Sequence, residues 1–235
     1  MSGAVLRELS GMAEFLAAER LQRAVWGGGD SPDPADLMMV VQAEGGLCAG
    51  AFRDGRLLAY VFGFPTRDPG AQHSHRLAVL PEARGQKLGL RLKWFQRDWS
   101  LARGITRLRW TFDPLRRLNA ALNIDALGAR AHLYHPDYYG EMAGINAGLP
   151  SDRLAVEWRL DTPEVSDRAA GHRAGPEPKC ILGRVPIPPD SALTARLRLR
   201  EDLQAAFAEG LEIGGFDRGT DSYLLVRRHG SGPGG

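Results

Sequence analysis

Apolar residues along the first 160 positions recur with strand-like and helix-like periods, and glycine, proline and aspartate separate the segments. The clearest helical stripe lies at 88–103, where apolar side chains recur every three or four positions. Two apolar strands flank Asp54-Gly55, a residue pair typical of a tight hairpin turn, and Asp33 is expected to cap a helix. The predicted strands cover residues 4–9, 47–53, 57–64, 75–80, 105–112, 129–134 and 154–160, and the predicted helices cover 12–26, 34–42, 88–103 and 113–127.

The pattern changes after residue 160. The next segment is polar and rich in proline and glycine, which is typical of a linker or an exposed loop. Beyond it, the apolar periods predict a small β-α-β-β unit, which is too short to fold well alone and is expected to pack on the main unit. The sequence therefore predicts a main domain at 1–160, a linker or exposed loop at 161–179, an extension at 180–228 and a flexible tail at 229–235.

The chain has 235 residues, of which 43% are hydrophobic and 25% are charged, so it has enough apolar material for a sizeable core. The net charge of +2 gives no strong field, which argues against a nucleic acid or an anionic membrane as a partner. No segment approaches the ~20 consecutive apolar residues that span a bilayer, and the first residues do not resemble a secretion signal. We therefore expect a cytoplasmic protein.

The chain has two cysteines, Cys48 and Cys180, and each lies in an apolar stretch. Both are expected to be small buried residues in a reducing compartment, although a disulfide between them stays open. No second cysteine pair or histidine cluster lies at ligand spacing, so no metal site is expected.

The chemistry is concentrated where the apolar strand at 75–80 runs into a loop with glycines and then into a helix. Small loop residues let backbone N–H groups converge, and the free N–H groups and the positive dipole end of the helix add to them. Arg84 and Lys87 add positive charge, so the segment is a candidate phosphate site, although an ordinary strand-to-helix turn explains the glycines about equally well. Gly85 and Gly89 match neither the nucleotide-binding P-loop nor the Gly-x-Gly-x-x-Gly loop of dinucleotide-binding proteins.

The strand and the loop after it resemble motif A of the GNAT superfamily of acetyltransferases, which reads Arg/Gln-x-x-Gly-x-Gly/Ala. Arg84 matches the first position and Gly89 the last, whereas Lys87 stands where the middle glycine is usual. The order of the predicted elements is also similar to that fold. Further runs at 110–115, 119–120, 138–140 and 149–153 resemble a little-characterised subgroup that carries a C-terminal extension.

This resemblance implies an α/β (α+β) GNAT fold, in which helices flank a mixed, mostly antiparallel twisted sheet and the β-α-β-β unit is a C-terminal extension. It also implies acetyl-CoA or another short-chain acyl-CoA as the cofactor. In the superfamily, the main chain of the strand binds the pantetheine arm and the loop amides bind the pyrophosphate. Asn119 on the next helix is a further candidate, with a plain surface role equally open. The residues expected to bind the cofactor are Leu77, Ala78, Val79, Arg84, Gly85, Gln86, Lys87, Leu88, Gly89 and Asn119.

The implied reaction is the direct attack of an amine on the thioester, with acetyl- or succinyl-CoA as the donor and a small molecule, such as an amino acid, as the acceptor. A base must take the ammonium proton, and the candidates are His75, Asp113 and Glu82. A histidine titrates in the right range, but a histidine hydrogen-bonded within the sheet fits His75 as well. Asp113 directly precedes Pro114 and is also a natural helix cap.

The acid for the leaving thiolate is sought among the tyrosines. Many relatives place a tyrosine where this chain has Ile124, so the candidates move to Tyr134, Tyr138 and Tyr139. We take Tyr139 as the predicted catalytic residue, with aromatic packing as the other role for all three and protonation by solvent as the other route.

Arg76 and Arg153 are candidates for binding the carboxylate of an amino-acid acceptor, although structural ion pairs explain both. The alternative function is a protein of the same fold that binds acyl-CoA as a sensor or interaction module, without turnover. A protein acetyltransferase is a third hypothesis. The expected partner is a small-molecule amine, with neither nucleic acid nor membrane, and a homodimer stays open.

Overall fold

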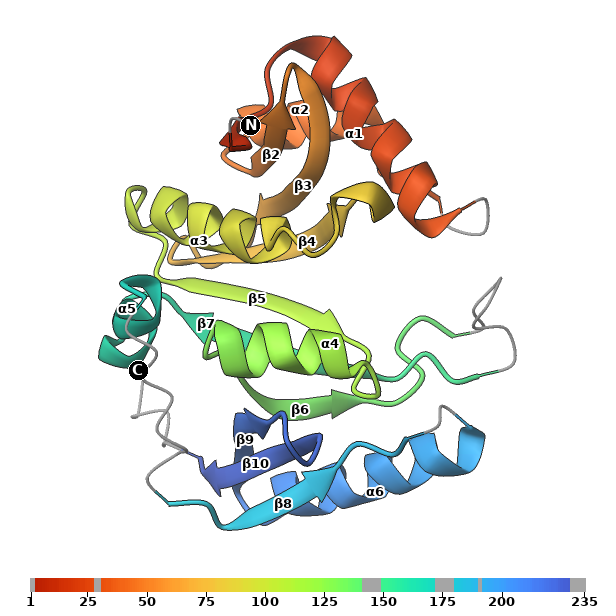
Figure 1. Cartoon of the computed structure of the whole chain (residues 1–235). Helices are drawn as coiled ribbons and strands as arrows, with labels where there is room; N and C mark the ends of the chain where they lie inside the picture. Colours follow the sequence, from red (N-terminus) through yellow and green to blue (C-terminus); the bar gives the residue numbers. More distant parts are fainter. Residues whose placement is uncertain (1–2, 28–30, 141–148, 172–179, 190–191, 229–235) are drawn as a thin grey trace. The chain divides into compact units, whose positions relative to one another are not determined.

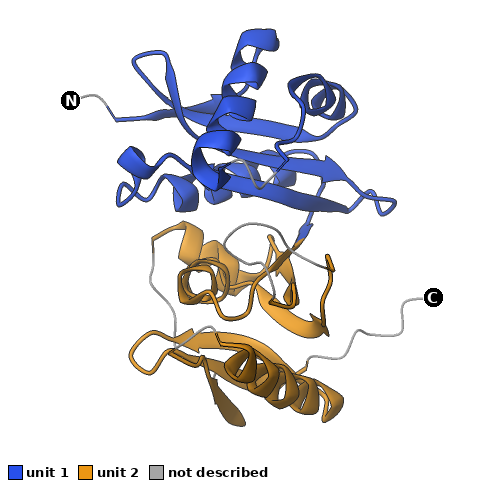
Figure 2. Ribbon diagram, turned by 90° about the vertical axis from the view of Figure 1, so that its right-hand side faces the viewer, with its two compact units in different colours: residues 1–109 blue, residues 110–235 orange. Residues whose placement is uncertain are grey.

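The protein, represented by a computed structural model, is described at residues 3–27, 31–140, 149–171, 180–189 and 192–228 (Figure 1). It divides into two compact units, unit 1 at residues 1–109 and unit 2 at residues 110–235 (Figure 2). Each unit combines helices with a mostly antiparallel arrangement of strands, so the predicted α/β (α+β) class is confirmed. Among the described residues, no helix is both long enough and apolar enough to cross a bilayer.

The strands of unit 1 are β1 (Val5–Glu8), β2 (Leu47–Arg53), β3 (Arg56–Pro65), β4 (Ala71–Val79) and β5 (Arg107–Phe112), at which the chain passes into unit 2. They are hydrogen-bonded in the order β1-β2-β3-β4-β5. Neighbouring strands are antiparallel, except that β4 and β5 are parallel. The predicted hairpin between β2 and β3 is confirmed, because Asp54 and Gly55 have the positive φ angles, 51° and 75°, that a type I′ turn requires.

The helical segments of unit 1 are α1 (Gly11–Trp26), α2 (Ala35–Ala43), η1 (Pro81–Ala83) and α3 (Leu88–Leu101). The apolar stripe predicted on α3 faces the core, with Leu88, Leu92 and Trp99 buried. Successive residues of β2 and β3 are buried, although they point to opposite faces of the sheet. Both faces of this part of the sheet are therefore covered.

The strands of unit 2 are β6 (Arg130–His135), β7 (Arg153–Arg159), β8 (Gly183–Pro186), β9 (Leu211–Asp217) and β10 (Ser222–Arg227), in the order β7-β6-β9-β10-β8. Its helices are α4 (Arg117–Ala120), the π-helical η2 (Ala121–Ala126), α5 (Pro163–Ala169) and α6 (Leu193–Ala208). The predicted β-α-β-β extension is confirmed as β8, α6, β9 and β10. It continues the sheet of unit 2, because Ala131 of β6 pairs with Ile213 of β9.

Several boundaries differ from the predicted ones. Strand β4 begins at Ala71 rather than at residue 75, because the buried polar residues Gln72 and Ser74 interrupt the apolar pattern. The expected linker contains α5, and the expected tail at 229–235 lies outside the described residues. The domain boundary expected at residue 160 stays a prediction. The two compact units meet at Arg109, but a compact unit need not coincide with a family domain.

Two smaller predictions are wrong. Cys180 is exposed, because it precedes β8 instead of lying within it, whereas Cys48 is buried and both thiols are free. Asp33 does not cap α2, whose N-cap residue is Pro34 without a side-chain hydrogen bond. The Asp33 carboxylate instead contacts His75 and Arg76 of β4.

Candidate functional site

The first part of the site is the edge of β4 that faces away from β3. Among the described residues, the ladder with β5 joins only Ala71, Gln72 and His73 of β4 to β5. On the other edge, the Leu80 N–H donates to the Leu58 carbonyl at 2.9 Å, so by alternation the main chain of Ala78 faces β3. The N–H and C=O groups of Leu77 and Val79 therefore point to the edge that is not paired with β5. Leu77 and Val79, two of the three predicted pantetheine-binding residues, therefore have main-chain groups that can bind a ligand at this edge. The main-chain groups of Ala78 are instead hydrogen-bonded to β3.

The second part is the loop between β4 and α3. After η1 the chain adopts positive φ angles at Gly85 and at Lys87, 78° and 56°, and the first helical bond runs from the Arg91 N–H to the Lys87 carbonyl. Within the described part of the chain, the backbone N–H groups at 85–90 donate no hydrogen bond. Converging N–H groups at a helix N-terminus attract an anion, so this loop, which we call the amide cradle (residues 84–90), has the donors that a pyrophosphate needs.

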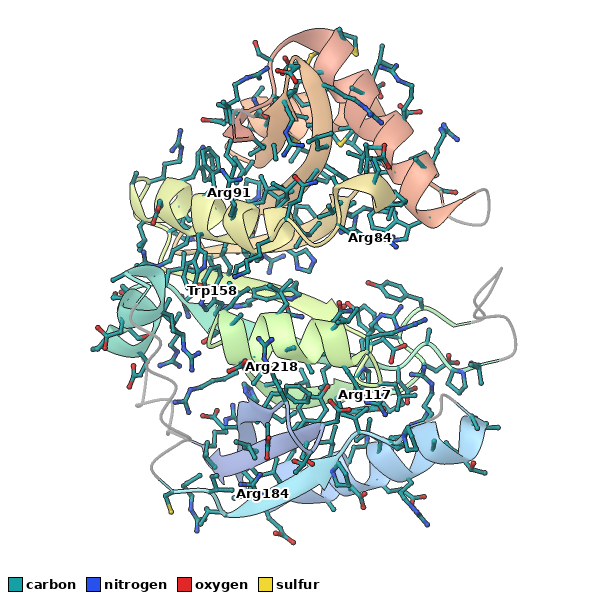
Figure 3. The ribbon with its side chains drawn as sticks, viewed as in Figure 1. Arg84, Arg91, Arg117, Trp158, Arg184 and Arg218 are labelled. Carbon is teal, nitrogen blue, oxygen red and sulfur yellow. The ribbon has the colours of Figure 1, made fainter. Side chains whose placement is uncertain are left out.

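Two basic side chains accompany the amide cradle. Arg84 and Lys87 are exposed, and Arg84 extends from the loop (Figure 3). The side chain of Gln86 is held from the other side, where it accepts a hydrogen bond of 2.5 Å from Arg53. A neighbouring ion pair joins Glu82 to Arg56, which leaves Glu82 a structural role. These contacts fix the loop to the β2–β3 hairpin.

A surface hollow of about 360 Å³ lies beside this loop, on the side of the hairpin. It is lined by Arg53, Asp54, Arg56, Leu58, Glu82, Ala83 and Gln86. None of these residues belongs to the free edge of β4 at Leu77 and Val79. The hollow is therefore not the place where the strand edge and the amide cradle meet.

The family motif has glycine where this chain has Lys87, and the structure explains that preference. Lys87 has φ 56° and ψ 21°, the left-handed region in which a Cβ atom costs about 1–2 kcal/mol. We expect Lys87→Gly to raise the free energy of unfolding by about 0.5–1 kcal/mol, because relief of this strain exceeds the added chain entropy. Urea unfolding measures the change, and Lys87→Ala is the control because it keeps the strain. Equal gains for both variants would contradict the explanation.

His75 lies at an irregularity of β4. The register with β3 shifts so that Ser74 pairs with Gly63 and Arg76 with Phe62, which leaves His75 as an extra residue, or bulge. The ring nitrogen Nε2 lies 3.2 Å from Oδ1 of Asp33, and about a third of the side chain is exposed. In the tautomer with the proton on Nε2, Asp33 orients the ring and Nδ1 keeps a lone pair.

The neighbours of His75 have different roles. Burial is the main cause that lowers the pKa of His73 to about 4, and the nearby His75 and Lys93 lower it further. The His73 ring also stacks on Phe64. His73 is therefore a poor proton acceptor at neutral pH. Arg76 forms an ion pair of 3.1 Å with Asp33 and lies over the ring of Trp26. Arg76, the predicted acceptor-binding residue, is thus already paired with a carboxylate of the protein.

The predicted residues Asp113 and Asn119 belong to unit 2. Each carboxylate oxygen of Asp113 lies 3.1 Å from a guanidinium nitrogen of Arg196, and Oδ1 also accepts from the Leu115 N–H. These contacts fasten α6 to the start of the α4 segment and give Asp113 an anchoring role. Asn119 is exposed on α4. The sequence did not predict this contact between Asp113 and Arg196, which are far apart along the chain.

The tyrosines of unit 2 fall into two environments. The Tyr134 hydroxyl donates to Asp152 at 2.7 Å, and burial together with this bond raises the pKa of Tyr134 well above its ordinary value. Tyr138 and Tyr139 are exposed, and Arg153 lies over the Tyr139 ring with its guanidinium carbon 5.0 Å from the ring centre. Tyr134 is thus committed to a buried contact, whereas Tyr139 and Arg153 form a surface pair.

Asp152 is the buried acceptor of this network and has no exposed surface. Burial alone raises the pKa of Asp152, but hydrogen bonds from Arg200, the Asp137 N–H and Tyr134 outweigh it, so the pKa is lowered. A lowered folded-state pKa stabilises the fold above the unfolded-state pKa, and this contribution disappears as the pH falls through the folded-state value.

We expect Asp152→Asn to lower the free energy of unfolding by about 3 kcal/mol at pH 7, because Arg200 and Tyr134 lose a charged partner. Urea unfolding measures the loss, and the exposed Asp167→Asn is the control, with an expected change within about 0.5 kcal/mol. The difference between Asp152→Asn and the unchanged protein should shrink toward pH 3. A loss that does not depend on pH would contradict the role of the charge.

The sequence comparison adds a family to this geometry. Residues 14–121 match the sequence model of the acetyltransferase (GNAT) family. This range contains the free edge of β4, the amide cradle and α3. This part of the chain, a little under half of its length, therefore resembles the GNAT acetyltransferase family. No curated protein matches the chain significantly.

Solved structures share the fold at low sequence identity. The ribosomal-protein-S18-alanine N-acetyltransferase of Escherichia coli is 17% identical, with a TM-score of 0.57 over 68% of this chain and 95% of its own. The protein yncA of Salmonella typhimurium, solved with its cofactor acetyl-CoA, is 16% identical, with a TM-score of 0.57 over 68% of this chain and 96% of its own. The phosphinothricin acetyltransferase of Sinorhizobium meliloti, in complex with acetyl-CoA, is 17% identical, with a TM-score of 0.55 over 68% of this chain and 89% of its own. These likenesses confirm the predicted GNAT fold.

Sequence reasoning missed two residues of unit 1 that the fold brings to β4. Asp33 was expected to be a helix cap, and it lies 42 positions from its partner His75. Lys93 is buried on α3, where it contacts Ser74 of β4. A signal for Lys93 existed in the sequence, because only three of the 30 basic residues are lysines and this one adjoins the apolar stripe at Leu92.

Proposed function

We propose that this protein is an N-acyltransferase that binds acetyl-CoA or another short-chain acyl-CoA and transfers the acyl group to the amine of a small molecule. The observation that carries the proposal is the continuity between the free main-chain edge at Leu77 and Val79 and the amide cradle that follows it. An extended amide-containing arm fits a free strand edge, and a pyrophosphate fits a cradle of N–H donors. Two of the structurally similar proteins, yncA and the phosphinothricin acetyltransferase, were solved with acetyl-CoA.

Each part of unit 1 then has a task. The main chain of Leu77 and Val79 holds the pantetheine arm, and the N–H groups from Gly85 onward hold the pyrophosphate, with Arg84 and Lys87 adding charge. The acyl-CoA supplies an activated thioester carbonyl. A main-chain N–H of the same strand edge, next to the thioester, stabilises the negative charge that develops on the carbonyl oxygen.

His75 is the proton acceptor in this proposal. Its Nδ1 takes a proton from the acceptor ammonium, while Asp33 holds the ring and stabilises the charge that the ring gains. The amine nitrogen then forms a bond to the carbonyl carbon and the carbon–sulfur bond breaks. The attacking nitrogen loses its second proton to solvent, and the leaving thiolate takes up one proton from solvent, since a thiolate is a good leaving group.

One observation favours a second function, which is acyl-CoA binding without turnover. Ile124, at the position where many relatives have a tyrosine, is fully buried, and the hydroxyl of Tyr134 is committed to Asp152. A sensor needs the strand edge and the amide cradle but no acid. The two functions therefore predict the same binding and different chemistry.

The test is release of free CoA thiol from acetyl-, propionyl- and succinyl-CoA in the presence of amine pools. The pools contain amino acids of both hands, polyamines or aminoglycosides, and a reaction without amine measures background hydrolysis. Amine-dependent release is expected for at least one pool. Stable binding of acyl-CoA with no amine-dependent release would favour the sensor. A protein that binds no acyl-CoA would overturn both functions.

A further inference from the structure

The surface hollow beside the amide cradle contains a buried hydrogen-bond donor without an acceptor. Its lining includes Arg53 and Arg56 of the β2–β3 hairpin and Glu82 and Gln86 from the segment between β4 and α3. All of these residues belong to unit 1. The volume of about 360 Å³ lies at the lower end of the roughly 300–1,000 Å³ that is usual for small-molecule sites. The hollow is thus large enough for a small ligand.

Arg53 is the residue of the hollow whose hydrogen bonding is incomplete. Its side chain is half-buried, and Nη2 donates a hydrogen bond of 2.5 Å to Oε1 of Gln86. Its Nε is buried and has no acceptor among the described residues. Arg53 also forms no ion pair with any carboxylate in the described part of the chain. A buried donor without an acceptor costs stability, so Arg53 lacks an anionic partner that would remove this cost.

Another arginine of the same chain shows which partner completes this edge of a guanidinium. The Nε and Nη2 atoms of Arg200 donate to the two carboxylate oxygens of Asp152 at 3.0 Å and 2.7 Å. Gln86 offers only one oxygen to the corresponding edge of Arg53, because the other group of an amide is a donor. A carboxylate in the place of the Gln86 amide would accept from both nitrogen atoms, and such bidentate pairs are strong.

The two carboxylates that line the hollow do not fill this position. Glu82 is paired with Arg56. Asp54 lies in the hairpin turn and is exposed, and its carboxylate has no hydrogen bond or ion pair with a described residue. The anionic partner of Arg53 therefore has to come from outside the described chain.

The remaining lining is suited to a displaceable side chain and a small ligand. Gln86 is exposed, so its side chain can leave Arg53 without opening the core. Leu58 and Ala83 provide the apolar part of the lining. These features favour a carboxylate that is attached to a small apolar body.

We infer that this hollow binds a small molecule with a carboxylate on an apolar body, and that Arg53 binds the carboxylate in place of the Gln86 side chain. Gln86 belongs to the amide cradle, and its bond to Arg53 fixes that loop to the hairpin. The ligand removes this bond and therefore lowers the affinity for acyl-CoA. Only this second effect rests on the proposed function, since binding of the carboxylate needs no acyl-CoA.

The test uses benzoate as the probe and benzamide as the uncharged molecule of the same shape. Each is titrated into the full chain, and the Nε–H signal of Arg53 is followed by proton–nitrogen NMR, with Arg53→Lys used to assign the signal. We expect a saturable shift with benzoate at a dissociation constant of about 1 mM, and no shift with benzamide. Arg53→Met should weaken benzoate binding, measured from the backbone signals of the loop, by at least about tenfold.

Gln86→Ala keeps the test open if Arg53→Met does not fold. This change removes the side chain that competes for Arg53, so benzoate should bind about threefold or more tightly, an effect that damage to the fold does not produce. Arg20→Met is the matched control, because Arg20 is an exposed arginine of α1 outside the hollow. It should leave benzoate binding unchanged.

A titration with acetyl-CoA tests the coupling. Saturating benzoate should raise the dissociation constant of acetyl-CoA about threefold or more in the unchanged protein, and not in Arg53→Met. An Arg53 signal that does not shift, equal binding of benzamide, or weaker benzoate binding in Gln86→Ala would overturn the site and leave the proposed function standing. An unchanged affinity for acetyl-CoA would overturn the coupling. A chain that binds benzoate but no acyl-CoA would overturn the proposed function and leave the site.

Discussion

Gly89→Glu is expected to weaken binding of acetyl-CoA by at least about a hundredfold. The change places a carboxylate in the first turn of α3, where the N–H groups at 85–90 are free to bind a phosphate. Like charges repel, and the new side chain also accepts from the amides that the pyrophosphate needs. Loss of two charge-assisted hydrogen bonds at about 1.5–3 kcal/mol each corresponds to a factor of this size.

The space around Gly89 can accept a side chain, so the variant changes the charge at the loop without displacing the backbone. A Cβ at this position would lie 3.6 Å from Leu77 and Val79, which is ordinary contact, so the backbone does not have to move. Calorimetric titration with acetyl-CoA measures the dissociation constant. Binding within about threefold of the unchanged protein would remove the amide cradle as the cofactor site.

Ala102→Glu is the matched control for this measurement. Ala102 is exposed and is the C-cap residue of the same helix, so the variant adds the same charge at the opposite end of α3. An anion at a helix C-terminus costs about 0.3–1 kcal/mol of stability, but it lies away from the free amides. Acetyl-CoA should therefore bind this control as it binds the unchanged protein.

The second large effect is expected for His75→Asn, which should lower kcat for amine-dependent CoA release on the order of a hundredfold near pH 7. Asparagine cannot take up the ammonium proton, but it keeps a polar group beside Asp33. Binding of acetyl-CoA should not change. The loss should become smaller as the pH rises, because the acceptor amine then gives up its proton without help.

His73→Asn is the control, since His73 lies on the same strand but has a pKa of about 4 and does not take up a proton near neutrality. Its kcat should stay within a few-fold of the unchanged enzyme, with thermal unfolding used to confirm folding. Asp33→Asn should cause an intermediate loss of about tenfold, because the ring of His75 loses its orienting charge. Unchanged kcat in His75→Asn would exclude His75 as the base.

Local elements of the fold follow directly from the sequence. Asp54-Gly55 predicts the hairpin because its positive φ angles are a property of the two residues themselves. The stripe of α3 predicts the buried face because helical spacing places Leu88, Leu92 and Trp99 on one side. The loop after β4 is also predictable from the sequence, because glycine-rich turns and helix starts depend on residues that are close together along the chain.

The candidate site was predictable only in part. The resemblance of the loop to motif A led to the amide cradle, and the free edge at Leu77 and Val79 agrees with it. The roles of single side chains were not predictable in this way. Asp113 bonds to Arg196 across 83 positions, and Asp152 bonds to Arg200 across 48, so no local pattern could show that these carboxylates anchor α6.

The sequence by itself therefore determined the type of most elements, the hairpin, the helix stripe and the loop, because these depend on the conformational preferences and periods of neighbouring residues. The tertiary structure decided which polar groups meet. Asp33 reaches His75, and Lys93 reaches Ser74, only after α1, α2 and α3 pack on the sheet. The physical reason is that hydrogen bonds and ion pairs act over a few ångströms in space, whatever the separation along the chain.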